Sequence, residues 1–327
     1  MELDSYGIYS YFTGNVNNIQ LSTIQTIDIS SEKVKTAKGV FYLDKKLGAG
    51  TYGKTYATLP VEGKSYAIKI MDMRNSKDIY NTLSEVIMNI ILAEGTQSMK
   101  NGPFVPELYE FGITADQTTA IIRSERLVDT VFNYLQRKSP LENNTLVPQL
   151  ILNVMNMLEI LEKKYQFNHR DLKSDNIMYI LKNGQPVWKF IDLGGACMKW
   201  NSFSIRSDSI FDVSRPCFHP GRDITFLLTE LLLDVPITSQ LKTSLHNLTT
   251  FPIYGHECAL NSEDCPHASY KKWVNIYNVL NKTNVINPKT SIIKSELNNF
   301  LQKLKRPLLN WTFRKAKRHG RHRTRRN

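Results

Sequence analysis

One octet of the sequence carries the residue types that a phosphate transfer requires. It reads His169-Arg170-Asp171-Leu172-Lys173-Ser174-Asp175-Asn176. Asp171 offers a carboxylate that can orient a hydroxyl group, and Lys173 offers an ammonium that can neutralise phosphate charge. Asn176 offers an amide oxygen of the kind that holds a hard metal ion. The spacing therefore predicts a loop that serves phosphoryl transfer.

A glycine-rich segment supplies a second element of such a site. Gly48-x-Gly50-x-x-Gly53 lies between two predicted strands, whereas the dinucleotide-binding fingerprint lies between a strand and a helix. Glycines let backbone N–H groups approach phosphate oxygens without interference from a Cβ atom. The candidate nucleotide-binding residues of this loop are Leu47, Gly48, Ala49, Gly50, Thr51, Tyr52 and Gly53.

A lysine follows on the next predicted strand. In Tyr66-Ala67-Ile68-Lys69, the alternation of a strand turns Ala67 and Lys69 to the same face. Ala67 would leave room for a base, and Lys69 would reach the phosphates. Glu85, within a predicted helix, is the best candidate for the carboxylate that holds Lys69, and Glu94 is the alternative.

A carboxylate follows the octet in Phe190-Ile191-Asp192-Leu193-Gly194. Asp192 suits magnesium because its oxygens are hard ligands. Further on, Asp223 in Gly221-Arg222-Asp223-Ile224 precedes an apolar run.

These segments together resemble the eukaryotic-type serine/threonine protein kinases. The octet resembles their catalytic loop, the glycine segment their nucleotide loop, Tyr66–Lys69 their Val-Ala-Ile-Lys strand, and Asp192-Leu193-Gly194 their Asp-Phe-Gly motif. The resemblance covers about residues 40 to 305. It implies ATP and Mg²⁺ as cofactors, protein substrates, and an α+β, bilobal fold. That fold has a small antiparallel β lobe with one helix and a larger, mainly helical lobe.

The resemblance also assigns roles to individual residues. It makes Asp171 and Lys173 catalytic and makes Asn176 and Asp192 the metal ligands. Ala67, Lys69 and Glu85 join the glycine loop as ATP-binding residues. Asp223 would brace the backbone of the catalytic loop, His169 would be structural, and Arg170 is typical of kinases that respond to a phosphate on the activation segment.

Two family features are missing. The stretch Asp208 to Pro220 holds no Glu for an Ala-Pro-Glu motif, and Asn287-Pro288-Lys289-Thr290-Ser291 holds no Arg to pair with it. Losing both partners of a buried ion pair costs much less than losing one. These absences, the compact form and the basic tail resemble divergent kinases encoded by large DNA viruses.

Periodicity predicts the elements that position these residues. We expect strands at 40–43 continuing into 46–53, 54–59, 65–71, 107–111 and 118–122, helices at 77–93, 146–161, 224–233 and 291–304, and a hairpin of 176–181 with 187–191. Pro148 is expected in the first turn of its helix. The predicted organisation is an N-terminal extension (1–38), a kinase domain (39–305, with lobes 39–124 and 127–305) and a basic tail (306–327).

Composition and charge narrow the class of protein. The chain has 327 residues and a formal net charge of +12, and 11 of its Lys and Arg lie between Gln302 and Asn327, where there is no Asp or Glu. Such a tail is either a solvated end or a handle for nucleic acid, an import receptor or acidic lipid. Without a membrane span, a secretory signal or enough cysteines for a disulfide scaffold, we expect an intracellular protein, cytoplasmic or nuclear, or in a virion if viral.

Three alternatives stay open at this stage. One is a small-molecule phosphotransferase of the kinase-like fold, such as an aminoglycoside or choline kinase. Another is a non-catalytic scaffold that uses the tail, with Trp311 and Phe313 as stacking groups, to hold nucleic acid. A zinc site of His256, Cys258, Cys265 and His267 is the third, although a plain loop is favoured there. Ser202, Ser204, Ser207 and Ser209 are candidate phosphorylation sites.

Overall fold

The structure is a computed structural model that describes residues 26–28, 32–36, 38–50, 53–74, 76–114, 116, 118–201, 203–206, 218, 220–248 and 290–305. Its chain divides into two compact units, one of residues 1–134 with 156–227 and the other of residues 135–155 with 228–327. The predicted domain limits stay predictions.

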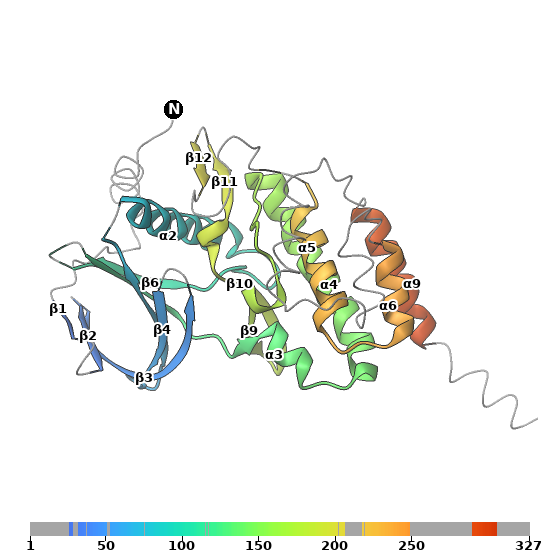
Figure 1. Ribbon diagram of the computed structural model, residues 1–327, viewed down its shortest axis with the longest axis horizontal. Coiled ribbons are helices and arrows are strands. Elements are labelled where there is room, and N and C mark those ends of the chain that lie inside the picture. Colours follow the sequence, from blue (N-terminus) through green and yellow to red (C-terminus); the bar gives the residue numbers. More distant parts are fainter. Residues whose placement is uncertain are drawn as a thin grey trace, which may run out of the picture. The chain divides into compact units, whose positions relative to one another are not determined.

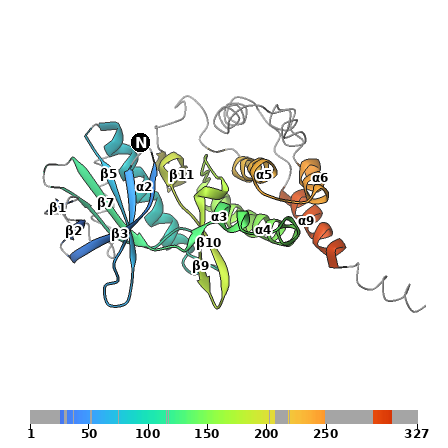
Figure 2. The ribbon, with the colours of Figure 1, turned by 60° about the horizontal axis from the view of Figure 1, so that its bottom comes forward.

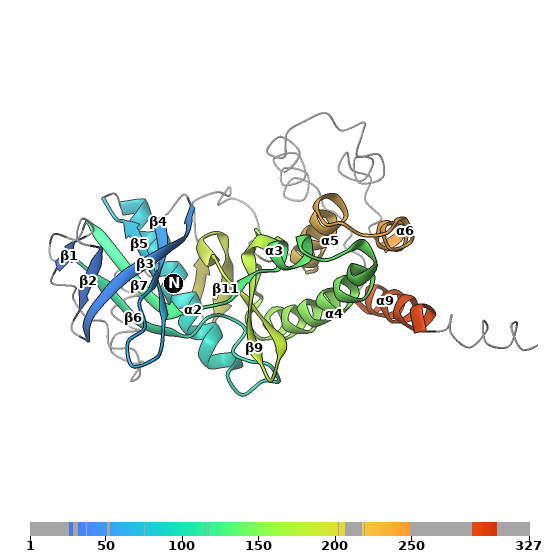
Figure 3. The ribbon, with the colours of Figure 1, turned by 90° about the horizontal axis from the view of Figure 1, so that it is seen from below.

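The first unit is built on a seven-stranded antiparallel sheet with the order β1-β2-β3-β4-β5-β7-β6 (Figure 1). The strands are β1 (Thr26–Asp28), β2 (Lys33–Thr36), β3 (Gly39–Gly50), β4 (Gly53–Thr58), β5 (Tyr66–Asp72), β6 (Leu108–Ile113) and β7 (Thr119–Glu125). β3 is long enough to pair with β2 at its start and with β4 at its end (Figure 3). β1 and β2 lie within the predicted N-terminal extension, so part of that segment continues the sheet.

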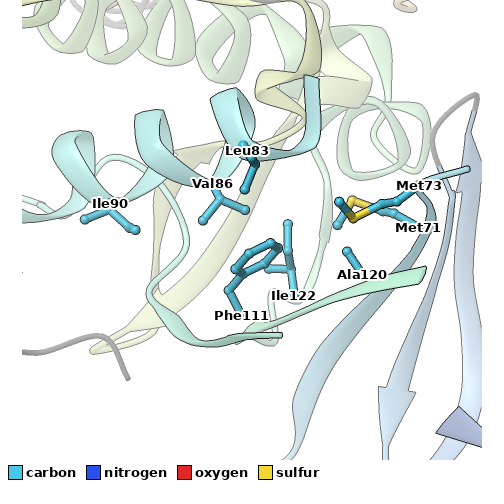
Figure 4. Close-up of a cluster of buried hydrophobic side chains, with 8 residues drawn as sticks. All are labelled: Met71, Met73, Leu83, Val86, Ile90, Phe111, Ala120 and Ile122. Carbon is cyan, nitrogen blue, oxygen red and sulfur yellow. The ribbon is translucent and has the colours of Figure 1, made fainter. Parts of the chain in front are cut away.

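Both faces of this sheet carry apolar side chains. On one face, helix α2 (Ser76–Thr96) packs through the stripe that periodicity predicted (Figure 4). The buried cluster there consists of Met71, Met73, Leu83, Val86, Ile90, Phe111, Ala120 and Ile122. The other face buries Val34, Phe41, Leu43, Ile68, Ile70 and Ile121. Full burial of an aliphatic or aromatic side chain contributes roughly 1.5–3 kcal/mol, so the two clusters fix the sheet and the helix together.

The remainder of the first unit holds short strands and turns. β8 (Asp129–Thr130), β9 (Ile177–Lys182) and β10 (Gln185–Phe190) form a three-stranded sheet, with β9 and β10 as a narrow hairpin (Figure 2). Its turn has positive φ at both Asn183 and Gly184, as the predicted Asn-Gly turn requires. A hairpin that the sequence did not predict, β11 (Cys197–Trp200) with β12 (Phe203–Arg206), follows and contacts α2.

The helices of the second unit are amphipathic. α6 (Ser239–Leu248) and α9 (Thr290–Lys305) contact each other, and the apolar side chains buried among their described residues include Leu241 and Leu245 on α6 and Leu297 and Phe300 on α9. Two further helices, α4 (Pro140–Tyr165) and α5 (Arg222–Asp234), have one end in each unit, as does the short α3 (Val131–Gln136).

The start of α4 differs from the prediction. Pro148 lies inside the helix and not in its first turn, because α4 begins at Pro140. Ser139 caps it: its Oγ accepts the N–H of Glu142 (3.3 Å), and the Glu142 carboxylate accepts the N–H of Ser139 (2.9 Å). This reciprocal capping box, Ser-x-x-Glu, was readable in the sequence. None of the described helices is long and apolar enough to cross a membrane.

Candidate active site

The glycine loop is the hairpin end between β3 and β4, with Gly50 opposite Gly53. Gly53 has φ of +154°, and a Cβ atom there would overlap the carbonyl oxygen of Ile70 on β5. Gly48, in contrast, has no atom within 4 Å of the position a Cβ would take. Leu47 is 43% exposed. Thr51 and Tyr52 lie outside the described residues.

Lys69 meets the carboxylate that the sequence proposed for it. Its Nζ donates to both Glu85 oxygens, at 2.7 and 2.9 Å, with side chains 21% and 12% exposed. This ion pair ties β5 to α2, while the alternative, Glu94, is exposed. An ammonium held this way is pre-positioned to receive phosphate oxygens.

Ser124 lies on the face of the sheet that carries Lys69, and the motifs did not predict it. Ser124 on β7 pairs directly with Ala67, and Ile122 pairs with Lys69, so their side chains share that face. The predicted strand stopped at residue 122, short of Ser124. Only the register of the sheet, which no motif specifies, brings Ser124 beside Ala67.

The catalytic-loop residues gather around one carboxylate. Lys173 Nζ donates to Asp171 Oδ2 at 3.1 Å, and Asn176 Nδ2 donates to the same oxygen at 3.0 Å and to the Asp171 carbonyl at 2.8 Å. Asp171 and Lys173 are 24% and 35% exposed, so both remain accessible to a substrate. Because the Asn176 amide N–H group faces Asp171, its Oδ1 is the atom left to bind a cation.

Asp223 holds the start of this loop through hydrogen bonds to its carboxylate. It is 0% exposed, and its carboxylate accepts the N–H groups of His169 (2.7 Å) and Arg170 (2.9 Å) and the amide of Asn168 (3.2 Å). Arg170 has a φ of 69°, a left-handed conformation that a charged side chain rarely adopts, and the Asp223 bonds hold it there. The predicted brace is therefore present.

Glu162 on α4 lies next to this brace. It accepts the N–H of Gly221 at 3.1 Å. Burial raises the pKa of Glu162 to about 7; the Gly221 bond opposes that rise, and the charges of Asp223 and Glu159 add to it. Nothing in the sequence motifs pointed to this carboxyl group.

Asp192 follows Ile191, whose backbone N–H and carbonyl groups both have hydrogen-bond partners. The N–H of Ile191 donates to the Asn176 carbonyl at 3.0 Å, and the Ile191 carbonyl lies 2.8 Å from His169 Nε2. His169 is 0% exposed, which fits the structural role expected for it. Asp192 itself is exposed and left-handed, with φ 58° and ψ 64°.

Leu193, the residue after Asp192, is buried. Leu193 is 1% exposed and begins a short turn, Leu193–Gly195, that contacts α2. The residue directly after Asp192 is thus a buried apolar side chain. Lys69 on β5 contacts Glu85 on α2, and Ile191, the residue before Asp192, is hydrogen-bonded to Asn176 of the catalytic loop. All of these residues belong to the first unit.

The donor set fits magnesium and a polyphosphate. The Asp192 carboxylate and the Asn176 amide oxygen are hard ligands of the type Mg²⁺ takes, while Lys69 and Lys173 supply positive charge for phosphate. Among the described residues no cluster of three His, Cys, Asp or Glu forms another metal centre. The arrangement can therefore hold a metal–nucleotide next to a carboxylate that accepts a proton.

Other predicted features fall elsewhere. Cys197 is buried and disulfide-bonded. Ser204 is exposed on β12. Several predicted features lie outside the described residues: Ser202, Ser207, Ser209, the His256–His267 cluster, the Asn287–Lys289 segment, the tail and most of Asp208–Pro220.

Comparison with known proteins shows which family the chain resembles. The family model described as the protein kinase domain matches residues 41–208, which is about half of the chain. A putative ribosomal protein S6 kinase alpha-1 of Caenorhabditis elegans is 26% identical over 190 residues, and calcium-dependent protein kinase 25 of Arabidopsis thaliana is 24% identical over 188. Each match covers 55% of this chain but only 22% and 34% of those relatives.

Solved structures match the fold. The BubR1 kinase domain superposes with a TM-score of 0.52 at 15% identity, covering 91% of each chain. Vaccinia related kinase 3 gives 0.51 at 14% identity, covering 90% of this chain and 96% of that one. The α+β kinase-like fold expected from the sequence is confirmed. With a family model that spans the glycine loop, the catalytic loop and Asp192, the chain belongs to the protein kinase domain family.

Proposed function

We propose that this protein is a serine/threonine protein kinase that transfers the γ-phosphate of ATP to Ser or Thr hydroxyls of proteins. The observation that carries the proposal is the cluster of Asp171, Lys173 and Asn176 on the Asp223 brace, with Asp192 delivered beside it. The Lys69–Glu85 ion pair completes it on the sheet side. Each group is of the type that a phosphoryl transfer needs at that place.

The proposed chemistry uses these side chains in fixed roles. Asp171 orients the substrate hydroxyl and accepts its proton as that oxygen bonds to the γ-phosphorus. The bond from the γ-phosphorus to the β-phosphate oxygen breaks, and ADP leaves with that electron pair. Lys173 neutralises charge on the phosphoryl group in transit, and Lys69 holds the α- and β-phosphates.

Asn176 and Asp192 would hold Mg²⁺, which when bound supplies charge neutralisation for the phosphates. The glycine loop from Gly48 to Gly53 would cover those phosphates with backbone N–H groups. Leu47 and Ala67 would contact the adenine, with Ser124 beside Ala67. Lys173, two residues after Asp171, favours serine and threonine over tyrosine as the acceptor, by the family resemblance.

A small-molecule phosphotransferase is the competing enzyme. It would share the Asp171–Asn176 spacing, but Lys173 and the full glycine loop favour a protein acceptor. The test offers casein, histone and a panel of amino alcohols as acceptors with ATP and Mg²⁺. We expect phosphate on protein Ser and Thr only, with Asp171→Asn and Lys69→Ala inactive. Transfer to an amino alcohol alone would overturn the proposal in favour of the competitor.

The scaffold alternative rests on the tail, residues 306–327, which lies outside the described residues. It predicts that Asp171→Asn leaves the biological effect unchanged and that deletion of residues 302–327 abolishes nucleic-acid binding. The opposite pair of results favours the kinase. An intracellular location, cytoplasmic or nuclear, with nucleic acid or an import receptor as the partner of the tail, remains part of the proposal.

A further inference from the structure

A buried lysine lies three residues before Asp192 and has no part in the chemistry above. Lys189 on β10 is 2% exposed and is among the largest fully buried side chains of the chain. A lysine is almost never buried to this degree unless its charge is paired. Its Nζ lies 2.8 Å from Glu125 Oε2, and Glu125 is 19% exposed.

The partner of Lys189 ends the strand that borders the proposed base site. Glu125 is the last residue of β7 and follows Ser124, which lies opposite Ala67. Glu125 Oε2 also accepts the N–H of Glu107 at 3.3 Å, and the Glu125 N–H donates to the Glu107 carbonyl at 2.8 Å. One carboxylate therefore joins the last residue of β7, the residue before β6 and the penultimate residue of β10.

Strand β10 is also linked to the end of α2 by a series of hydrogen bonds. The Phe190 N–H donates to the Phe104 carbonyl at 2.8 Å, and the Phe104 N–H donates to Thr96 Oγ1 at 3.0 Å. Thr96 Oγ1 in turn donates to the Leu92 carbonyl at 2.6 Å. Lys189 Nζ adds a longer bond, 3.4 Å, to the Val105 carbonyl. β10 thus reaches Asp192 with its position already set by α2 and by β7.

We propose that the Lys189–Glu125 ion pair is a positioning tie that sets the base-binding end of β7 relative to the metal-binding Asp192, and so determines the affinity for a magnesium nucleotide. This inference rests on the proposed function, because it assumes that one nucleotide spans Ala67 and Asp192. Neither side chain touches the reacting atoms. Both act through the backbone: Glu125 through Ser124, and Lys189 through Phe190 and Ile191.

The physical reason is the cost of an unpaired buried charge. If Glu125 becomes neutral, the Lys189 ammonium remains in a site that water does not reach, and β10 must shift to solvate it. A shift of β10 moves Asp192 away from the place that the nucleotide needs. Because the pair is buried, screening by salt should hardly change its effect.

A matched control exists in the seven-stranded sheet, which also contains Glu125. Arg123 and Glu110 form another buried ion pair, 3.0 Å apart and 8% and 2% exposed. Arg123 neighbours Ser124 but lies over the rings of Phe41 and Tyr66, at 4.5 and 4.7 Å, which pack on the opposite face of the sheet. Variants of either pair should therefore lose general stability, whereas only variants of the Lys189–Glu125 pair should lose nucleotide affinity.

The experiment measures the Kd of Mg-AMP-PNP and the Tm for the full chain. The variants are Lys189→Met, Glu125→Gln, their double variant, and Glu110→Gln as the control. We expect each single variant of the tie to weaken binding about tenfold, within the range by which residues that touch neither ligand alter binding. The double variant should be no weaker than the weaker single one, since the interaction is lost only once.

The outcomes separate the tie from the proposed function. If the wild type does not bind Mg-AMP-PNP, the proposed function fails and the tie fails with it. If the wild type binds and Glu125→Gln binds equally well, or if Glu110→Gln weakens binding as much, the tie alone is wrong. Should Lys189→Met fail to fold, Glu125→Gln still decides, because its side chain is nearly isosteric and partly exposed.

Discussion

Removing the carboxylate of Asp223 tests how the catalytic loop is held. In Asp223→Ala, the N–H groups of His169 and Arg170 lose the acceptor that they contact at 2.7 and 2.9 Å. Both residues are buried, at 0% and 9% exposure, so water cannot replace the acceptor without opening the loop. A hydrogen bond to a charged group contributes about 1.5–3 kcal/mol, so the two together predict a loss of about 3–6 kcal/mol in the free energy of unfolding.

The size of this effect makes it measurable. Globular domains have free energies of unfolding of about 5–15 kcal/mol, so the variant loses a large part of its stability. Asp223→Asn retains one carbonyl oxygen but turns an N–H₂ group toward a backbone N–H, and about half of the loss is expected from it. Urea unfolding followed by circular dichroism gives these values, and the Kd of Mg-AMP-PNP on the folded fraction reports the geometry of the loop.

The control for this series is Asp44→Asn, an exposed carboxylate on β3. A surface substitution of that kind should stay within about 0.5 kcal/mol of the wild type. If Asp223→Ala unfolds within about 1 kcal/mol of the control, the Asp223 carboxylate does not stabilise the catalytic loop.

Three further predictions concern other positions. Gly53→Ala should lower both Tm and nucleotide affinity, because its Cβ would overlap a β5 carbonyl, whereas Gly48→Ala, with open space, should lower affinity alone; equal Tm losses would contradict this. The folded-state pKa of Glu162, about 7, lies above the ordinary value of 4.5. Its stabilisation is therefore complete below pH 4.5 and is lost as pH rises through 7, by about 1–2 kcal/mol after allowance for partial exposure, and Glu162→Gln should flatten the pH profile of urea unfolding. Gly95→Ala should destabilise because its Cβ would overlap the Tyr165 hydroxyl, and Tyr165→Phe in the same chain should restore part of the loss; no restoration in thermal unfolding would exclude that clash.

The candidate catalytic and metal-binding residues could be predicted because phosphoryl transfer restricts their types and spacing. Asp171, Lys173 and Asn176 lie within six positions, so a single loop brings them together without any long-range register. Glu85 was predicted as the partner of Lys69 because it lies within the predicted helix, whereas Glu94 lies at the end of that helix.

The supporting contacts were not predictable in the same way. Ser124 reaches Ala67 through the pairing of β5 with β7, and Glu125 reaches Lys189 across two separate sheets. Such contacts depend on long-range register, which local patterns do not encode. The start of α4 was a different kind of miss, because Ser139 and Glu142 carried a capping signal that the proline at position 148 obscured.

The β11–β12 hairpin was missed for lack of a turn signal. Its turn residue Asn201 has φ of 53°, but no glycine follows it, so the sequence lacked the Asn-Gly signature that revealed β9 and β10. Trp200 and Phe203 stack across the turn with ring centroids 6.2 Å apart, and their pairing became visible only in the structure.

The proposed function requires Lys69, Asp171, Asn176 and Asp192 to surround one nucleotide and its metal. The most direct measurement is a crystal structure of the protein with AMP-PNP and Mn²⁺, in which anomalous scattering locates the metal. We expect manganese bound by the Asp192 carboxylate and the Asn176 amide oxygen, with Lys69 on the α- and β-phosphates. Manganese at any other set of ligands, or a triphosphate that does not contact Lys69, would contradict the proposed function.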